Sequence, residues 1–286
     1  LTVSLGTGSL TFTRQYDSLE YGLAGSFGNG WRWTLGDFRV QTNLPVGLRE
    51  AQGVYEPVRD GTRVYLTVPD GQRIGFTFTP QRLETGALVA YHPGWTADAG
   101  SGYVLESVST VLTKAAGKYY ELNTGLPYHP AGWFFQGPAY TLTAGDGTRY
   151  ELDGKGQTTA VMPAGGPRVT VTDSGIMDAQ GNVLAAFVRD AAGRITALSD
   201  GGRNVRHYQY DAAGNLESVS QNADEAESRY AYEASGRLSV ASSRGRTAAG
   251  SAGPAPRRPR RGARTRTSSR SARPPRSTAS RQSWRS

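Results

Sequence analysis

Two of the three histidines in the chain lie in segments that resemble each other. The segments are Tyr-His-Pro-Gly-Trp at residues 91–95 and Tyr-His-Pro-Ala-Gly-Trp at residues 128–133. Two imidazoles presented by related loops could bind a metal ion or another ligand. However, they lack the His-Glu-x-x-His spacing of a zinc site, and no nearby acidic residues complete a ligand set. A histidine that precedes proline in an extended loop explains both segments, so the sequence predicts no metal and no cofactor.

Three acidic residues recur at regular steps near the end of the chain. Asp190, Asp211 and Glu233 are 21 and 22 residues apart, and a glycine follows each of them three residues later. A ladder of carboxylates could supply general acids or calcium ligands, but the Asp-x-[Asn/Asp]-x-[Asn/Asp]-Gly pattern of a calcium loop is absent. A carboxylate that accepts turn amides, with glycine in the left-handed conformation, explains the spacing without catalysis. The predicted structural residues of these turns are Asp190, Gly193, Tyr210, Asp211, Gly214, Tyr232, Glu233 and Gly236.

Signatures of nucleophilic catalysis are missing from the sequence. The chain has no cysteine, no Gly-x-Ser-x-Gly elbow and no P-loop frame around its Gly-Lys pairs. We therefore predict no catalytic residues and a protein that is not an enzyme.

Tryptophan residues offer the best candidate for a binding surface. Trp95 and Trp133 follow glycine in loop-like segments, where an exposed ring could stack on a sugar or anchor a protein partner. Trp31 and Trp33 lie two residues apart, which fits a strand with one apolar face and favours packing in a core. Both interpretations, a ligand surface and a packed interior, stay open for Trp95 and Trp133.

The spacing of glycine and of apolar residues indicates β-hairpins throughout residues 1–243. Glycine makes up 37 of 286 residues, nearly twice the usual share. Asp-Gly pairs separate short runs of alternating polarity, such as Val64, Leu66 and Val68 on one face, and Asp-Gly is typical of type I′ hairpin turns. The pairs are Asp60-Gly61, Asp70-Gly71, Asp146-Gly147 and Asp153-Gly154. No stretch of this region has the 3.6-residue period of a helix.

The net charge of +8 conceals two oppositely charged parts. Residues 244–286 contain thirteen arginines and no acidic residue, whereas residues 1–243 contain 19 basic and 24 acidic residues. The arginine-rich segment has no Leu, Ile, Val, Phe or Met, so we expect a disordered tail. Two explanations stay open: a genuine basic arm that binds nucleic acid, or the product of a shifted reading frame.

The acidic turns also carry a family resemblance. Tyr-Asp-Ala-Ala-Gly-Asn-Leu at residues 210–216 and Tyr-Glu-Ala-Ser-Gly-Arg-Leu at residues 232–238 resemble the YD repeat of bacterial Rhs proteins. Phe-Gly-Asn-Gly-Trp at residues 27–31 is similar to a segment that often precedes such repeats. The resemblance covers roughly residues 11–240. It implies one long β-sheet that spirals into a hollow shell, often around a C-terminal toxin.

We therefore predict an all-β chain in which serial hairpins of YD repeats form a curved, partly open sheet, a fragment of an Rhs shell. An N-terminal β region is expected over 1–165, the repeats over 166–243 and the disordered tail over 244–286. The first residue is not methionine, and we expect a piece of a longer chain. The resemblance implies a non-catalytic scaffold in a secreted or cell-surface protein.

The partners implied by the resemblance are the rest of an Rhs-type chain or its toxin cargo. The alternative is an adhesion module that binds carbohydrate or a cell surface through its Trp- and Tyr-rich loops. Nucleic acid is a partner only if the basic tail is genuine. No run of 18 apolar residues is present, so no transmembrane helix is expected.

Overall fold

The computed structural model describes residues 2–4, 9–69, 71–85, 88–200, 204–221, 227–243 and 246–249. The expected tail over 244–286 lies outside the described residues, except for the backbone of one strand at its start. Asp70, the first residue of one expected Asp-Gly turn, also lies outside them. No helix in the described part of the chain is long and apolar enough to cross a membrane.

The described residues form an all-β structure, as predicted. They contain antiparallel strands and two short 3₁₀ turns, η1 (Ser18–Glu20) and η2 (Glu50–Gln52), and no α-helix. Glycine- and aspartate-rich turns interrupt the chain every few residues, which leaves no segment long enough for a stable helix.

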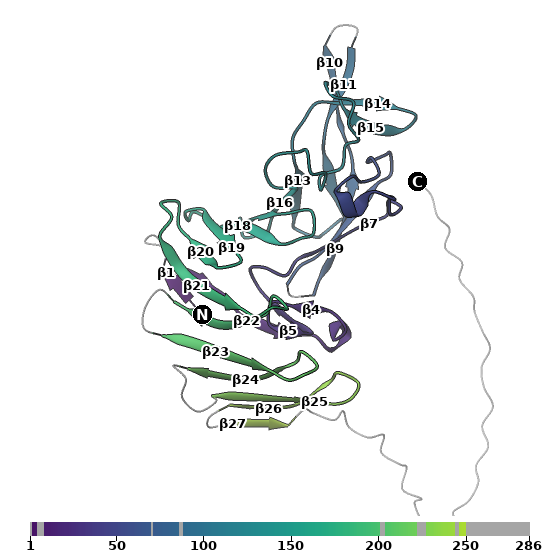
Figure 1. The fold of residues 1–286 in the computed structure, drawn as a ribbon. Helices are drawn as coiled ribbons and strands as arrows, with labels where there is room; N and C mark the ends of the chain where they lie inside the picture. Colours follow the sequence, from purple (N-terminus) through teal and green to yellow (C-terminus); the bar gives the residue numbers. More distant parts are fainter. Residues whose placement is uncertain are drawn as a thin grey trace, which may run out of the picture. The chain divides into compact units, whose positions relative to one another are not determined.

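One antiparallel sheet contains thirteen strands. Its order begins with β13 (Val104–Ser107) and β16 (Tyr140–Thr143) and then follows the chain to its last described strand. These strands are β17 (Arg149–Leu152), β18 (Thr158–Met162), β19 (Val169–Thr172), β20 (Gly175–Met177), β21 (Val183–Arg189), β22 (Ile195–Ser199), β23 (Val205–Tyr210), β24 (Leu216–Gln221), β25 (Ser228–Tyr232), β26 (Leu238–Ser243) and β27 (Arg246–Ala249). Because each strand from β16 pairs with the next, the sheet is a series of hairpins with edges at β13 and β27 (Figure 1).

The thirteen-stranded sheet crosses residue 165 without a break. β18 pairs with β19 through Val161 and Val169, on either side of a short turn. The sequence predicted a boundary at this residue between an N-terminal region and a repeat region. The strands before and after it belong to the same sheet, so the boundary stays a prediction.

Five smaller sheets among the described residues precede or flank the large sheet, three of two strands and two of four strands. Near the N-terminus, β1 (Thr2–Ser4) pairs with β2 (Ser9–Thr11), β3 (Arg14–Tyr16) with β6 (Trp31–Trp33), and β4 (Ala24–Gly25) with β5 (Gly28–Asn29). A four-stranded sheet contains β7 (Arg39–Thr42), β8 (Arg63–Thr67), β9 (Arg73–Phe78) and β12 (Trp95–Ala97). Another contains β10 (Gln81–Thr85), β11 (Leu88–His92), β14 (Leu112–Ala115) and β15 (Lys118–Glu121).

The hairpin turns differ from the predicted type I′. In the turn at Asp153–Gln157, the amide of Asp153 donates to the carbonyl of Gln157 and the amide of Gly156 donates to the carbonyl of Asp153. Gly156 has a positive φ, whereas Ala116 is the one non-glycine residue with positive φ in the described part of the chain. The type I′ prediction is therefore wrong at Asp60, Asp146 and Asp153, none of which has a positive φ. At the latter two, a tight turn followed by a one-residue bulge needs only one left-handed residue. The same backbone pattern recurs at 68–72, 144–148, 178–182, 190–194, 211–215 and 233–237.

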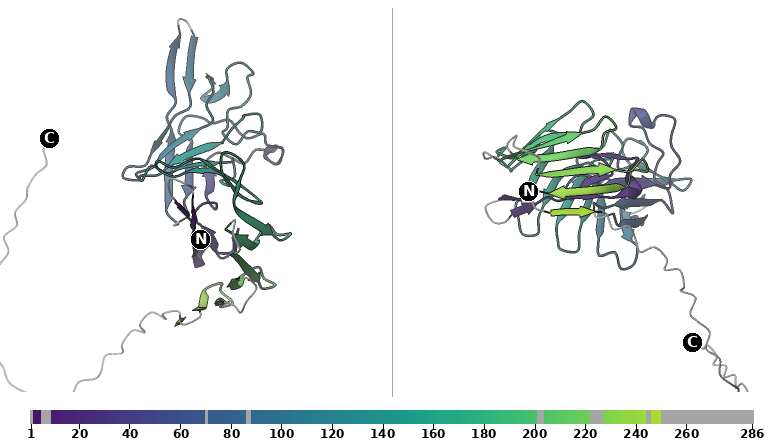
Figure 2. Two further views of the ribbon diagram at one scale, coloured as in Figure 1. Left: turned by 90° about the vertical axis from the view of Figure 1, so that its left-hand side faces the viewer. Right: turned by 90° about the horizontal axis from the view of Figure 1, so that it is seen from below.

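Residues 10–35 cover one face of the large sheet. Their buried apolar side chains pack in a single cluster with residues of strands β18 to β24. The cluster contains Leu10, Phe12, Phe27, Trp31, Trp33, Leu35, Val161, Val169, Ile176, Ala185, Phe187, Ile195, Leu198, Tyr208, Leu216 and Val219. The N-terminal strands lie against β21 and β22 in two views (Figures 1 and 2). Burial of this apolar area supplies most of the stabilisation of this half of the structure.

The other buried side chains form two further clusters around the smaller sheets. Val64, Leu66, Ile74 and Phe76 alternate inward along β8 and β9, which confirms the period of two predicted for these runs. Phe78 continues the same face into the third cluster, where it contacts Tyr119 and Tyr128.

Candidate functional site

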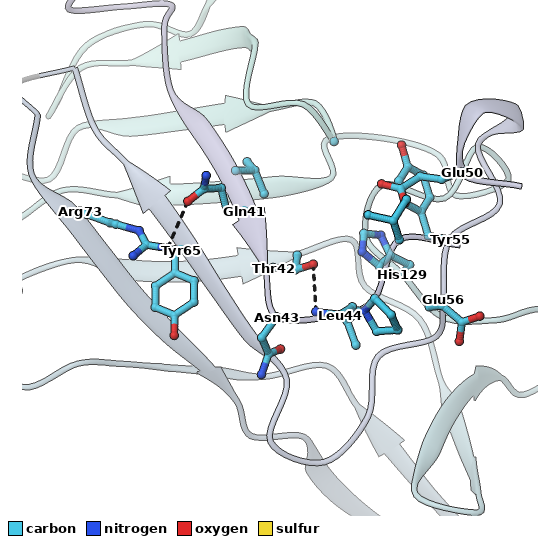
Figure 3. Close-up of a pocket in the computed structure, with 14 residues that line it drawn as sticks. Gln41, Thr42, Asn43, Leu44, Glu50, Tyr55, Glu56, Tyr65, Arg73 and His129 are labelled. Atoms are coloured by element: carbon cyan, nitrogen blue, oxygen red, sulfur yellow. Dashed lines mark hydrogen bonds between the residues drawn. The ribbon is translucent and has the colours of Figure 1, made fainter. Parts of the chain in front are cut away.

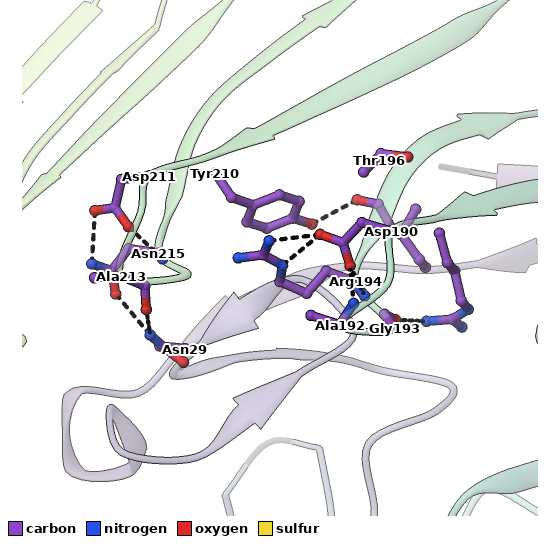
Figure 4. A network of polar contacts seen from close by, with 12 residues as sticks. Asn29, Asp190, Ala192, Gly193, Arg194, Thr196, Tyr210, Asp211, Ala213 and Asn215 are labelled. Carbon is purple, nitrogen blue, oxygen red and sulfur yellow. Dashed lines mark hydrogen bonds and ion pairs between the residues drawn. The ribbon is translucent and has the colours of Figure 1, made fainter.

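Two of the three repeat turns, those at Asp190 and Asp211, are stabilised by their acidic residue. The Asp190 carboxylate accepts hydrogen bonds from the backbone amides of Ala192 at 3.0 Å and Arg194 at 2.9 Å (Figure 4). The Asp211 carboxylate accepts from the amide of Asn215 at 2.9 Å. The glycines at the fourth position, Gly193 and Gly214, have φ values of 80° and 89°. The turns thus have the capping carboxylate and the left-handed glycine that the spacing predicted.

The residue after each glycine makes a second bond to the same carboxylate. Arg194 Nε lies 2.7 Å from Asp190 Oδ2, and Asn215 Nδ2 lies 2.8 Å from Asp211 Oδ2. Asn182 makes the same 2.8 Å contact with Asp178 in the turn upstream. Sequence reasoning noted Arg or Asn at this position but assigned it no role. The signal was present, because both side chains can donate to an acid four residues earlier.

These hydrogen bonds keep the turn carboxylates ionised. Desolvation acts to raise the pKa of Asp190 and Asp211, but the hydrogen bonds from Arg194 and Asn215 outweigh it. Both pKa values therefore lie below the ordinary value for aspartate. The charged form is the better acceptor for turn amides, so the caps persist at neutral pH.

The third repeat turn lacks this cap. The turn at Glu233 closes through the same backbone bonds, but the described side-chain contact of Glu233 is with the Ser235 hydroxyl at 3.3 Å. The extra methylene of glutamate places its carboxylate beyond the amides that aspartate reaches. Glu233→Asp should therefore stabilise the chain by about 0.5–1.5 kcal/mol, measured by urea unfolding. Glu217→Asp, on the exposed face of β24, is the control and should bring no gain; equal gains would contradict this role.

The tyrosine that precedes the acid in a repeat bonds to the previous hairpin. Tyr210 Oη donates to the carbonyl of Ile195 at 2.6 Å, and Tyr232 Oη donates to the carbonyl of Leu216 at 2.8 Å. Burial raises the pKa of both hydroxyls, so they stay protonated as donors. The repeats at Asp211 and Glu233 are thus each linked to the preceding hairpin by a side chain as well as by strand pairing.

The segment 26–31 docks on the same turns. The backbone amide of Asn29 donates to the carbonyl of Gly214 at 3.2 Å, and its side-chain amide donates to the carbonyl of Ala213 at 2.8 Å (Figure 4). The amide of Ile195 donates to the carbonyl of Ser26 at 2.8 Å. Backbone groups of two successive repeat turns are therefore satisfied by a segment about 180 residues earlier in the chain.

The comparisons with known proteins agree with this geometry. A family model described as RHS Repeat matches residues 178–225, which contain the turns at Asp178, Asp190 and Asp211. Residues 178–225 therefore match the Rhs repeat family. A comparison with curated proteins found no match to the chain. The match confirms the resemblance inferred from the repeated turns, and the similarity of residues 27–31 to an Rhs segment lies outside the matched range.

Aromatic side chains of the N-terminal segment also contact the residues around the repeat turns. Trp31 Nε1 donates to Tyr232 Oη at 2.8 Å, and the Tyr16 hydroxyl donates to the carbonyl of Gly236. The Tyr230 ring lies 5.0 Å from that of Trp31, and the Tyr16 and Tyr232 rings are 5.6 Å apart. The repeat tyrosines share a face, as predicted, but they pack on these rings and not as cross-strand pairs with each other.

Tyr232→Phe should lower the free energy of unfolding by about 1–3 kcal/mol. The change removes the donor to the Leu216 carbonyl and the acceptor of the Trp31 indole in one step. Tyr230→Phe is the control, because the Tyr230 hydroxyl has no hydrogen bond with a described residue. We expect the control to lie within about 0.5 kcal/mol of the original chain. Equal losses in urea unfolding of the two variants would count against the link between hairpins.

The two tryptophans predicted as ligand-binding candidates lie in different surroundings. Trp95 packs its ring 5.1 Å from that of Phe78, and its Nε1 donates to the Ser107 hydroxyl at 2.8 Å. Trp133 is 68% exposed and contacts Phe134. The structure does not place them in one surface, and a ligand-binding role for either residue stays a prediction.

The two histidine segments also differ. His129 is buried and stacks on Tyr55 with 4.5 Å between ring centroids, and its Nδ1 accepts from the amide of Ala131 at 3.2 Å. Burial lowers the pKa of His129 to about 4. His92 Nδ1 lies 3.2 Å from the carbonyl of Thr110. In the described part of the chain, no three His, Cys, Asp or Glu side chains are grouped to hold a metal.

A pocket of about 600 Å³ lies beside His129 (Figure 3). Tyr55, Tyr65, Glu50 and Arg73 contribute to its walls, and neither candidate tryptophan does. Arg73 lies 4.1 Å from the centroid of the Tyr65 ring, so that ring already carries a cation over its face. Tyr55 and Tyr65 in the walls of this pocket are therefore already in contact with His129 and Arg73.

Proposed function

We propose that this Rhs repeat protein is a non-catalytic segment of a β-shell in a secreted or cell-surface protein. The shell would enclose a toxin that acts in competition between cells. The partners would be the remainder of a longer Rhs-type chain and its cargo. The family match supports the structural role, and the enclosed cargo and the location are our extension of it.

The observation that carries the proposal is the way each hairpin is joined to the next. Strand pairing repeats along β20 to β26, the tyrosine bond recurs at Tyr210 and Tyr232, and the aspartate cap recurs in the turns at 178–182, 190–194 and 211–215. Further hairpins could be added with the same kinds of contact. In such repeats, each unit is stabilised by its nearest neighbours. The described strands of the sheet leave two edges, β13 and β27, at which further strands could pair.

Expression of the chain together with its neighbouring coding sequence tests the shell. Electron microscopy should show closed hollow particles, and a protease should cut the enclosed segment only after the particles are unfolded. Open, extended particles with an accessible cargo would overturn the proposal. The same neighbouring sequence decides whether residues 244–286 are a genuine basic arm, the one case in which nucleic acid would be a partner.

An adhesion module is the second candidate, and one observation favours it. Trp133 is 68% exposed and stands beside Phe134, an arrangement that could stack on a sugar ring. A glycan array with the full chain and with Trp133→Ala separates the two functions. We expect no retained glycan for a shell segment. A glycan that binds the original chain and not the variant, with unchanged unfolding, would favour adhesion.

A further inference from the structure

A second pocket lies between the N-terminal segment and the Rhs repeats. Its volume is about 400 Å³, and it is lined by residues of both regions. The walls include the aromatic rings of Phe27, Trp31, Tyr208 and Tyr230. No acidic residue is among its lining residues, whereas Arg14 and Arg206 both are. The pocket therefore combines flat apolar walls with two positive charges.

Three aromatic rings surround the guanidinium of Arg14, and no described residue accepts a hydrogen bond from its Nη1. Its central carbon lies 5.5, 5.4 and 5.0 Å from the ring centroids of Phe27, Trp31 and Tyr208. Ring faces stabilise the positive charge, but they leave the N–H groups without strong acceptors. Arg14 Nη1 is buried and has no hydrogen-bond partner among the described residues, and an unsatisfied buried donor on a charged group is costly.

Arg206 supplies the second charge from β23. It lies two residues before Tyr208 and therefore on the same face of the sheet. Its guanidinium forms no ion pair or hydrogen bond with a described residue. Burial raises the pKa of Tyr208, and both Arg14 and Arg206 act to lower it. The Tyr208 hydroxyl therefore lies within the field of both guanidinium groups.

We propose that this pocket binds a carboxylate carried on an aromatic body. The carboxylate would accept from the guanidinium groups of Arg14 and Arg206, and the ring would stack among Trp31, Tyr208 and Tyr230. Guanidinium and carboxylate match in geometry and form charge-assisted bonds stronger than neutral ones. The volume suits a small aromatic acid or the C-terminal phenylalanine of a peptide. The inference is independent of the shell, because it depends only on contacts within this chain.

Binding of phenylacetate to the full chain tests the proposal, with phenylacetamide as the matched neutral probe. Calorimetry and the fluorescence of the tryptophans that line the pocket, Trp31 and Trp33, would follow the titration. We expect phenylacetate to bind about tenfold more tightly than the amide, because only the acid forms charged hydrogen bonds. The proposal would be overturned if phenylacetate and phenylacetamide bound equally well. It would also be overturned if neither phenylacetate nor the peptide acid N-acetyl-Ala-Phe bound.

Substitutions of the two arginines test whether phenylacetate binds at this pocket. Arg14→Gln should weaken phenylacetate binding by about tenfold and leave the amide unchanged, and Arg206→Gln should weaken it several-fold. Arg49→Gln removes an equal charge at an exposed position outside the pocket and should have no effect. If Arg14→Gln does not fold, Arg206→Gln and the comparison of acid with amide still decide the result. Unchanged acid binding in Arg206→Gln would contradict the assigned site.

A second pair of probes identifies the source of the ligand. N-acetyl-Ala-Phe has a free C-terminal carboxylate, and its C-terminal amide is the neutral control. Tighter binding of phenylacetate indicates a free small acid, and tighter binding of the dipeptide indicates the end of a peptide. Either result supports a carboxylate site, provided that Arg14→Gln abolishes the preference for the charged probe.

Discussion

Replacement of Gly28 by alanine is expected to destabilise the chain by about 3–5 kcal/mol. Gly28 has a φ of 90°, which L-residues adopt only at a cost. A Cβ at this position would lie 2.5 Å from the carbonyl oxygen of Gly214 and 3.1 Å from the Tyr210 ring. The segment 26–31 would have to withdraw from the Rhs repeat turns, and its bonds at Asn29 and Ser26 would be lost. Urea unfolding of the full chain measures the change.

Two other glycines serve as controls that distinguish the conformational cost of a positive φ from the steric clash of an added Cβ. Gly193 also has a positive φ, of 80°, but a Cβ there would meet nothing within 4 Å. Gly193→Ala should therefore cost only about 1–2 kcal/mol. Gly22 has open space and no positive φ, and Gly22→Ala should be close to neutral. Equal losses at Gly28 and Gly193 would show that docking of the N-terminal segment contributes little to stability.

The second large expected effect concerns the pH dependence of the free energy of unfolding. Two buried groups change this free energy in opposite directions, and their contributions cancel in the original chain. His129 is neutral in the folded state down to a pKa of about 4, because burial opposes its charge, whereas the ordinary value is 6.5. As the pH falls from 6.5 to 4, the unfolded chain therefore binds a proton that the folded chain does not. Folding loses about 3 kcal/mol over this range through His129.

Asp37 acts in the opposite direction. Burial raises its pKa from 3.8 to about 6, against the hydrogen bonds from the Trp33 amide and the Ser26 hydroxyl. The folded chain therefore binds a proton near pH 6 that the unfolded chain binds only near 3.8. Its protonation stabilises folding below 3.8, and about 3 kcal/mol is lost as the pH rises through 6.

Single substitutions should reveal the two opposing slopes. His129→Asn keeps an acceptor for the Ala131 amide but does not titrate, so its stability relative to the original chain should rise as the pH falls from 6.5 to 4.5. Asp37→Asn should show a relative fall over the same range. The double variant should follow the original chain. Urea unfolding at several pH values measures all four chains, and parallel curves would contradict the burial of these two groups.

The local parts of the fold were predictable because their causes are local. An aspartate, a glycine three residues later and alternating apolar residues determine a capped turn between two strands, whatever surrounds them. The turns at Asp190 and Asp211 and the inward faces of β8 and β9 follow from such patterns. The turn type was mistaken, because Asp-Gly alone does not reveal the bulge that removes the need for a second left-handed residue.

The N-terminal segment shows where local reasoning stops. Trp31 and Trp33 were expected in a core from their spacing, and both are buried. Their partners could not be read from spacing, because Trp31 bonds to Tyr232 and Asn29 to Ala213 across 201 and 184 residues. For the same reason the burial of His129 and the raised pKa of Asp37 had no sequence signal.

The amino-acid sequence by itself determined the capped turns, the match of residues 178–225 to an Rhs repeat, and the confinement of the excess positive charge to residues 244–286. Those properties depend on neighbouring residues and on composition. Only the tertiary structure decided that residues 10–35 cover the repeats and that Arg14 lies among three rings with no described acceptor for its Nη1. Such contacts arise when distant segments close over a common apolar face, and burial there sets which polar groups are satisfied and which are left for a ligand.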